Sequence, residues 1–248
     1  ADHITEGGIL ELHYARDPNG TIALLLGNGA FVCCTYNRLE QLQAWWRLEL
    51  ASGSTFSGAV SDGPHGSRLW QAVNREGAGY LEAIDFYDDD NHLDAAVDAQ
   101  VSGNAIAGLG HLEGAEVSIV SGGAVVGSGT VAGGGVALEA DDGTSVTVGL
   151  PFTPLARLLP FAQLGEKKRP VRVSVTLHDS DLPLVNGKRC SADRSPATPQ
   201  DEVESGVTGM RSCTLKGWDG EGEIEITQDV PLRTEILAVS IVGAANGA

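Results

Sequence analysis

The sequence lacks any hydrophobic run that approaches the roughly 20 residues needed to cross a lipid bilayer. It also lacks, at its start, the basic segment followed by an apolar one that marks a secretory leader. We therefore expect no membrane insertion and see no sign of secretion. The 248 residues, of which 42% are hydrophobic, suffice to bury the core of one large or two modest domains.

Cysteine is scarce, and its spacing does not match a metal site. None of the four cysteines forms a C-x-x-C pair. Cys33 and Cys34 are adjacent, and neighbours on a strand point to opposite faces, so they do not readily chelate one ion. We favour buried, reduced thiols. Cys190 and Cys213 are an alternative pair that would close the loop between them, although a reducing compartment opposes such a bond.

Recognised catalytic motifs are absent. The sequence contains no G-x-S-x-G, H-E-x-x-H or G-x-x-x-x-G-K-[ST] pattern. The run His178-Asp179-Ser180-Asp181 has suitable residue types, but contiguous residues at the end of a strand do not converge as a triad does. We therefore predict a protein that is not an enzyme, with no catalytic, cofactor-binding or metal-binding residues. A glycoside hydrolase, which needs only two suitably separated carboxylates, remains open.

Basic side chains are missing from a long central segment. The chain has 16 Lys and Arg against 33 Asp and Glu, a net charge of -17. Between Glu76 and Ala156 there are thirteen acidic residues and no Lys or Arg. Such a surface repels phosphate. It is either a solubilising acidic face or a wall past which DNA slides without sticking.

Consecutive aspartates at Asp88–Asp90 invite comparison with a calcium loop, because Ca²⁺ takes clustered carboxylate oxygens. An EF-hand needs alternating ligands, a central Gly and a Glu at the twelfth position, and this run lacks them. We interpret it as a solvated acidic loop. Whether it binds a cation stays open.

Short apolar runs separated by turn residues dominate the rest, which predicts an all-β fold. Turns such as Asp17-Pro18-Asn19-Gly20 separate the early runs. Residues 39–50 also show helical spacing, but we favour a strand. The expected organisation is a β-meander forming a partial propeller-like region (1–86), an acidic linker (87–104), a small glycine-rich β-barrel or sandwich domain (105–152), and a connector, long loop and C-terminal strands that return to the main β-domain (153–248).

Four strands are expected between Gly108 and Pro151, and further elements are expected after them. Leu155–Leu159 suits one helical turn before Pro160. Residues 171–177 alternate as a half-buried strand. Residues 179–212 predict a long loop, and 234–244 predict a buried strand.

Tryptophan offers the one candidate ligand platform. Trp45, Trp46 and Trp70 suit the filling of a core, since large aromatics bury much apolar area. The alternative is a surface that stacks on a glycan.

Several short motifs share their order with one known family. They are Thr5–Ile9, Thr35–Gln41, Trp45-Trp46, Tyr80-Leu81-Glu82, Gly108–Gly114, Val117, Val148–Phe152, Gly222–Asp229 and Pro231-Leu232. In this order they resemble the tail nozzle proteins of short-tailed bacteriophages, also called tail tubular protein B. Typical members are several times longer, and the resemblance falls on their C-terminal portion.

The resemblance implies a structural protein of the virion tail. Members of the family assemble as a hexameric ring below the portal and adaptor, with a central channel for DNA. It implies β-propeller-like and small β-domains and no catalytic residues. The implied partners are other copies of the chain, adaptor and portal proteins, tail fibres, and DNA in transient passage. A β-rich glycan-binding or adhesin-type tail module is the alternative function.

Overall fold

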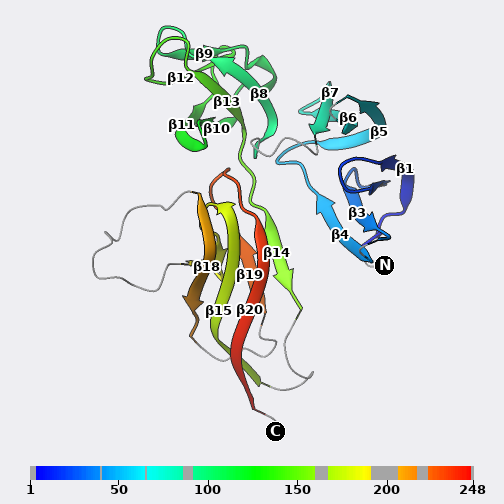
Figure 1. Cartoon of the computed structure of the whole chain (residues 1–248). Coiled ribbons are helices and arrows are strands. Elements are labelled where there is room, and N and C mark those ends of the chain that lie inside the picture. Colours follow the sequence, from blue (N-terminus) through cyan, green and yellow to red (C-terminus); the bar gives the residue numbers. More distant parts are fainter. Residues whose placement is uncertain are drawn as a thin grey trace. The chain divides into compact units, whose positions relative to one another are not determined.

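The computed structural model describes residues 4–39, 41–64, 66–85, 92–159, 167–190, 206–216 and 223–246. Most of these residues lie in strands of antiparallel sheets, and none of them lies in an α-helix, which confirms the all-β prediction (Figure 1). The chain divides into two compact units, Ala1–Ala95 and Ala96–Ala248. Asp88–Asp90, with its open cation question, lies outside the described residues.

The first unit contains two sheets whose strands follow chain order, as expected of a meander. Sheet A consists of β1 (Ile9–Ala15), β2 (Thr21–Leu26), β3 (Phe31–Asn37) and β4 (Leu42–Leu48). Sheet B consists of β5 (Ser54–Gly63), β6 (Gly66–Arg75) and β7 (Ala78–Asp85). Within the ambiguous segment 39–50, residues 42–48 form a strand, as predicted, because β4 pairs along its whole length with β3.

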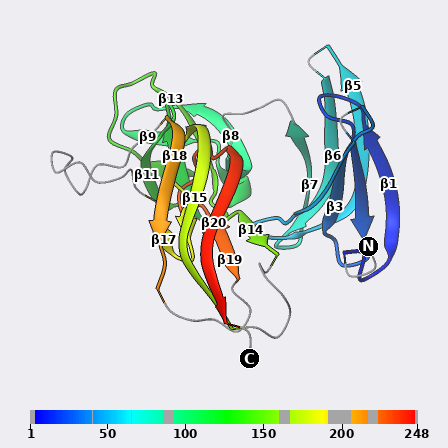
Figure 2. The same ribbon diagram turned by 60° about the horizontal axis from the view of Figure 1, so that its bottom comes forward.

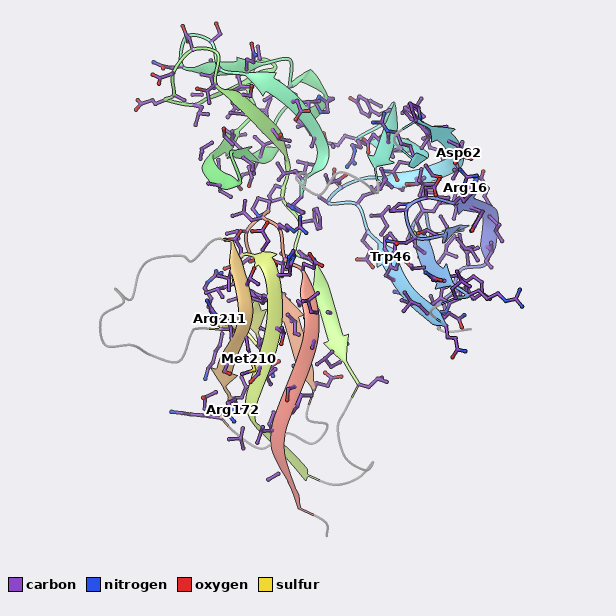
Figure 3. The ribbon with its side chains drawn as sticks, viewed as in Figure 1. Arg16, Trp46, Asp62, Arg172, Met210 and Arg211 are labelled. Atoms are coloured by element: carbon purple, nitrogen blue, oxygen red, sulfur yellow. The ribbon has the colours of Figure 1, made fainter. Side chains whose placement is uncertain are left out.

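The two sheets form a sandwich around one apolar core. Leu25, Phe31 and Cys33 of sheet A are buried together with Leu69 of sheet B. At the edge of the sandwich, the Ser67 hydroxyl donates to Asp62 Oδ1 at 2.6 Å and accepts from the Asp17 backbone N–H at 3.2 Å. These bonds tie the β1–β2 turn to the β5–β6 hairpin, and Figure 3 shows the neighbouring Arg16 close to Asp62.

The first unit contains a buried cluster of three charged side chains, Arg75, Glu82 and Asp94. Arg75, only 4% exposed, donates to Glu82 Oε1 at 2.6 Å and to Asp94 Oδ1 at 2.7 Å. Asp94 also accepts from the backbone N–H of Ala51 at 2.7 Å. Asp94, which follows the Asp88–Asp90 run in the sequence, is thus held by contacts to Arg75 and Ala51 of the same unit. Two carboxylates at one guanidinium offset the cost of removing all three charges from water.

A small glycine-rich region follows. The prediction of a linker over 87–104 was wrong for residues 94–100, which form strand β8 (Asp94–Gln100). This strand forms because its pairing with β13 outweighs the low strand propensity of an Ala- and Asp-rich sequence. The sheet order is β11-β10-β13-β8, from β10 (Glu116–Ser121), β11 (Ala124–Thr130) and β13 (Ser145–Leu150). β9 (Ala105–Ala107) pairs with β12 (Gly135–Ala137), and a single 3₁₀ turn, η1, covers Gly110–Leu112. The four strands expected after Gly108 are present, but they form no closed barrel within these described residues.

This region, the β8–β13 module, is internally duplicated. The Val101 N–H donates to Thr144 O, and the Val131 N–H donates to Ala115 O, both at 3.0 Å. The Gly143 and Gly114 N–H groups return to Val101 O and Val131 O, both at 2.9 Å. Each half thus contributes strand, short strand and strand, and the halves interlock. Carboxylates fix the turns, since Glu113 accepts from the N–H groups of Gly133 and Gly134, which have positive φ.

The remaining strands form a second sandwich of their own. One sheet has the order β14-β19-β16-β17 and the other β18-β15-β20, and Figures 1 and 2 show the latter as one layer. The bounds are β14 (Leu155–Leu158), β15 (Lys167–Ser180), β16 (Leu184–Val185), β17 (Lys188–Arg189), β18 (Val207–Thr214), β19 (Ile224–Thr227) and β20 (Ile236–Asn246). Val173, Val175 and Leu177 lie in its core with Ile224 and Ile226. Contrary to expectation, these strands pair with one another and not with sheet A or B.

Three local predictions in this region were wrong. Residues 155–158 form strand β14 instead of a helical turn, because they pair with β19. The strand predicted as buried, 234–244, is the half-exposed edge strand β20, with Leu237 60% exposed. The expected loop 179–212 contains β16, β17 and the start of β18, whereas its part 191–205 lies outside the described residues.

Candidate docking surface

Sheet A has a second apolar face, directed away from the first unit's core. Strand alternation places Leu24 and Val32 on the side opposite Leu25 and Phe31, and they form a separate buried cluster with Ile4 packed against it. We call the residues on this side the outer face of sheet A. It comprises Leu12, Tyr14, Ile22, Leu24, Val32, Cys34, Tyr36 and Trp45.

Large side chains on this face are open to solvent. Leu12 is 65% exposed, Tyr14 53%, Tyr36 47% and Trp45 36%. Register aligns Tyr14, Ile22, Cys34 and Trp45 in one row across all four strands. These exposed side chains flank Leu24, Val32 and Cys34, which are buried on the same face. A group of exposed apolar side chains marks a binding surface more often than a single one does.

The three candidate tryptophans do not gather on one surface. Trp45 lies on the outer face of sheet A, whereas Trp46, labelled in Figure 3, packs against the core on the other side of β4. Trp46 Nε1 donates to Thr35 Oγ1 at 3.2 Å. Trp70 lies on sheet B, where its neighbours Leu69 and Gln71 face inward, and its Nε1 donates to Ser61 Oγ at 2.8 Å. A platform built from all three is therefore absent, and Tyr14 and Tyr36 are the aromatic neighbours that sequence reasoning missed.

The polar run at the end of β15 is structural. The Ser180 hydroxyl is 1% exposed, lies 2.7 Å from the His178 carbonyl and accepts from the Glu235 N–H at 2.7 Å. His178 Nδ1 lies 3.2 Å from Glu235 Oε2, away from that hydroxyl. Ser180 thus has its hydrogen-bonding capacity taken up by backbone groups.

Asp181 is a buried carboxylate, and burying its charge lowers the free energy of unfolding. Burial raises its pKa, and nearby Arg189 opposes that shift only in part. Within the described residues its Oδ1 accepts no hydrogen bond. A raised folded-state pKa favours folding while the group is protonated, so this contribution is lost as pH rises through that pKa.

An Asp181→Asn variant is therefore expected to be more stable than wild type at pH 7, by about 1 kcal/mol. The gain shrinks as the pH falls, because the wild-type carboxyl then takes up its proton. Thermal unfolding at pH 7 and at a series of lower pH values measures it. Asp141→Asn, at an exposed carboxylate, serves as the control and should not stabilise the protein. A destabilised Asp181→Asn protein at pH 7 would contradict this role.

In the described part of the chain, no three His, Cys, Asp or Glu side chains lie close enough to hold a metal ion. The described ranges also hold no helix with the length and apolar character of a membrane span. Comparison with known proteins found no matching family model and no matching curated protein.

Proposed function

We propose that this chain is a structural subunit of the tail nozzle of a short-tailed bacteriophage, located in the virion tail. Identical copies form a ring, with adaptor, portal and fibre proteins as neighbours, and DNA passes through it during ejection. The ordered motifs that resemble the nozzle family support this proposal. It assigns the chain a structural role and no catalytic one.

The observation that carries the proposal is the charge of the β8–β13 module. Its six carboxylates from residue 96 to 150 are all exposed, and no Lys or Arg accompanies them. They are Asp98, Glu113, Glu116, Glu139, Asp141 and Asp142. Such a surface repels the phosphate backbone, which carries a charge about every 1.7 Å of duplex. DNA therefore moves past it without being held.

The outer face of sheet A supplies the contact between copies. Its exposed aromatic and leucine side chains are of the kind that dominate protein interfaces. A head-to-tail contact between this face and a different surface of the next copy closes into a ring when its rotation permits.

Charge reversal tests the DNA-passage role. The variant Glu116→Lys/Glu139→Lys/Asp141→Lys changes carboxylates for which the structure shows no side-chain hydrogen bond. We expect wild type to leave duplex DNA unretarded in a gel at low salt, and the variant to bind it with an affinity that falls as salt rises. The matched neutral variant Glu116→Gln/Glu139→Gln/Asp141→Asn should not bind. Tight, salt-dependent binding by wild type would contradict the proposal.

The alternative, a glycan-binding tail module, is favoured by one feature. Tyr14, Tyr36 and Trp45 expose aromatic rings on one flat sheet face. Glycan-array binding that Trp45→Ala abolishes and Trp70→Ala leaves intact would support it. The nozzle proposal predicts no such binding.

A further inference from the structure

Cys190 and Cys213 meet in the core of the C-terminal sandwich. Cys190 directly follows β17, and Cys213 lies near the end of β18. Both side chains belong to the same buried cluster, with exposures of 0% and 4%. Cys213 Sγ lies 3.6 Å from the carbonyl of Lys188, two residues before Cys190. The fold thus brings two thiols from separate strands to one place.

The two thiols also interact directly. Burial raises the pKa of Cys190 to about 12, and the neighbouring Cys213 side chain adds to the rise. Cys190 therefore stays a thiol at neutral pH. Cys33 and Cys34, by contrast, sit next to each other on β3 and face opposite sides of sheet A. Of the four cysteines, only Cys190 and Cys213 are arranged as partners.

We propose that Cys190 and Cys213 are an oxidation site, at which a small peroxide converts the two thiols into a disulfide. Cys213, the more exposed of the pair, reacts first: its sulfur takes an oxygen from hydrogen peroxide, giving a sulfenic acid and one water. The Cys190 thiol then gives up its proton to the leaving hydroxyl as its sulfur attacks the sulfenic acid, which forms the S–S bond and a second water. Two thiols are oxidised and one peroxide is reduced, so atoms and electrons balance.

The bond would link β17 to β18 and close the chain between them into a loop. Closing a loop of this length removes conformational freedom from the unfolded chain. We expect the melting temperature of the C-terminal sandwich to rise by about 5–10 °C on oxidation. The inference does not depend on the proposed nozzle function.

Peptide mapping of the 248-residue chain tests the site. The native chain is treated with hydrogen peroxide, the remaining thiols are blocked with an alkylating reagent, and the protein is digested with trypsin. Cleavage after Arg189, Arg194, Arg211 and Lys216 releases peptides 190–194 and 212–216. We expect these two to be joined, with a mass lower by two hydrogen atoms than their sum, and separated again by a reductant.

Cysteine variants and a urea-denatured sample distinguish a specific disulfide from random cross-linking. Cys190→Ala or Cys213→Ala should abolish the joined peptide, whereas Cys33→Ala should leave it. In urea, the same treatment should scatter the cross-links among the four cysteines. The proposal is overturned if the native protein shows no joined peptide after its thiols have been oxidised, or if its cross-links are as scattered as those in urea.

Discussion

An Arg75→Met variant is expected to lose about 3–5 kcal/mol of the first unit's unfolding free energy, the loss typical when one partner of a buried ion cluster is removed. The variant leaves Glu82 and Asp94 facing each other without their shared cation. Their exposures are only 17% and 11%, so water does not replace the guanidinium. Urea unfolding followed by tryptophan fluorescence measures the loss, because Trp45, Trp46 and Trp70 report on this unit.

Arg16→Met is the matched control, since Arg16 is 71% exposed and its ion pair is with Asp17, which is also exposed. Exposed pairs contribute about 0–1 kcal/mol, so its unfolding midpoint should barely move. Adding Glu82→Gln to Arg75→Met removes one stranded charge and should restore part of the loss. Equal effects of Arg75→Met and Arg16→Met would show that the cluster does not hold the unit together.

Introducing charge on the outer face of sheet A is expected to abolish association between copies. Leu12→Glu/Trp45→Glu places two carboxylates among exposed apolar side chains that we assign to the contact. Loss of a central aromatic anchor typically costs 2 kcal/mol or more, about a 30-fold weaker association. Sedimentation velocity over a range of concentrations measures the change.

Leu81→Glu is the control for this variant. Leu81 is 71% exposed but lies on sheet B, so the substitution changes charge without touching the outer face of sheet A. It should assemble like wild type. Circular dichroism melting should show all three proteins folded. If Leu81→Glu dissociates copies and Leu12→Glu/Trp45→Glu does not, the contact lies elsewhere.

Strand identity was readable from the sequence where apolar runs met turn residues. The apolar runs that form β2 and β3 are buried, as expected of apolar runs between turns. Residues 155–158 and 94–100 were misjudged because partners distant in sequence, β19 and β13, decide their conformation. Local propensity carries no information about such pairing.

The candidate functional features differ in how far the sequence predicts them. The acidic module was visible as a charge pattern. Its internal duplication has a weak sequence signal, since Val101-Ser102-Gly103 is similar to Val131-Ala132-Gly133. The outer face of sheet A was hidden, since an apolar residue at an alternating position reads as core whether or not a second layer covers it. The sequence offered Cys190 and Cys213 only as an alternative pair, and the fold places both in one buried cluster.

Electron microscopy of the assembled 248-residue chain tests the central claim most directly. The nozzle proposal predicts a closed ring of identical copies whose bore is lined by the carboxylates of the β8–β13 module, with the outer face of sheet A covered by a neighbouring copy. Monomeric particles at every concentration, or a bore lined by Lys and Arg, would contradict it.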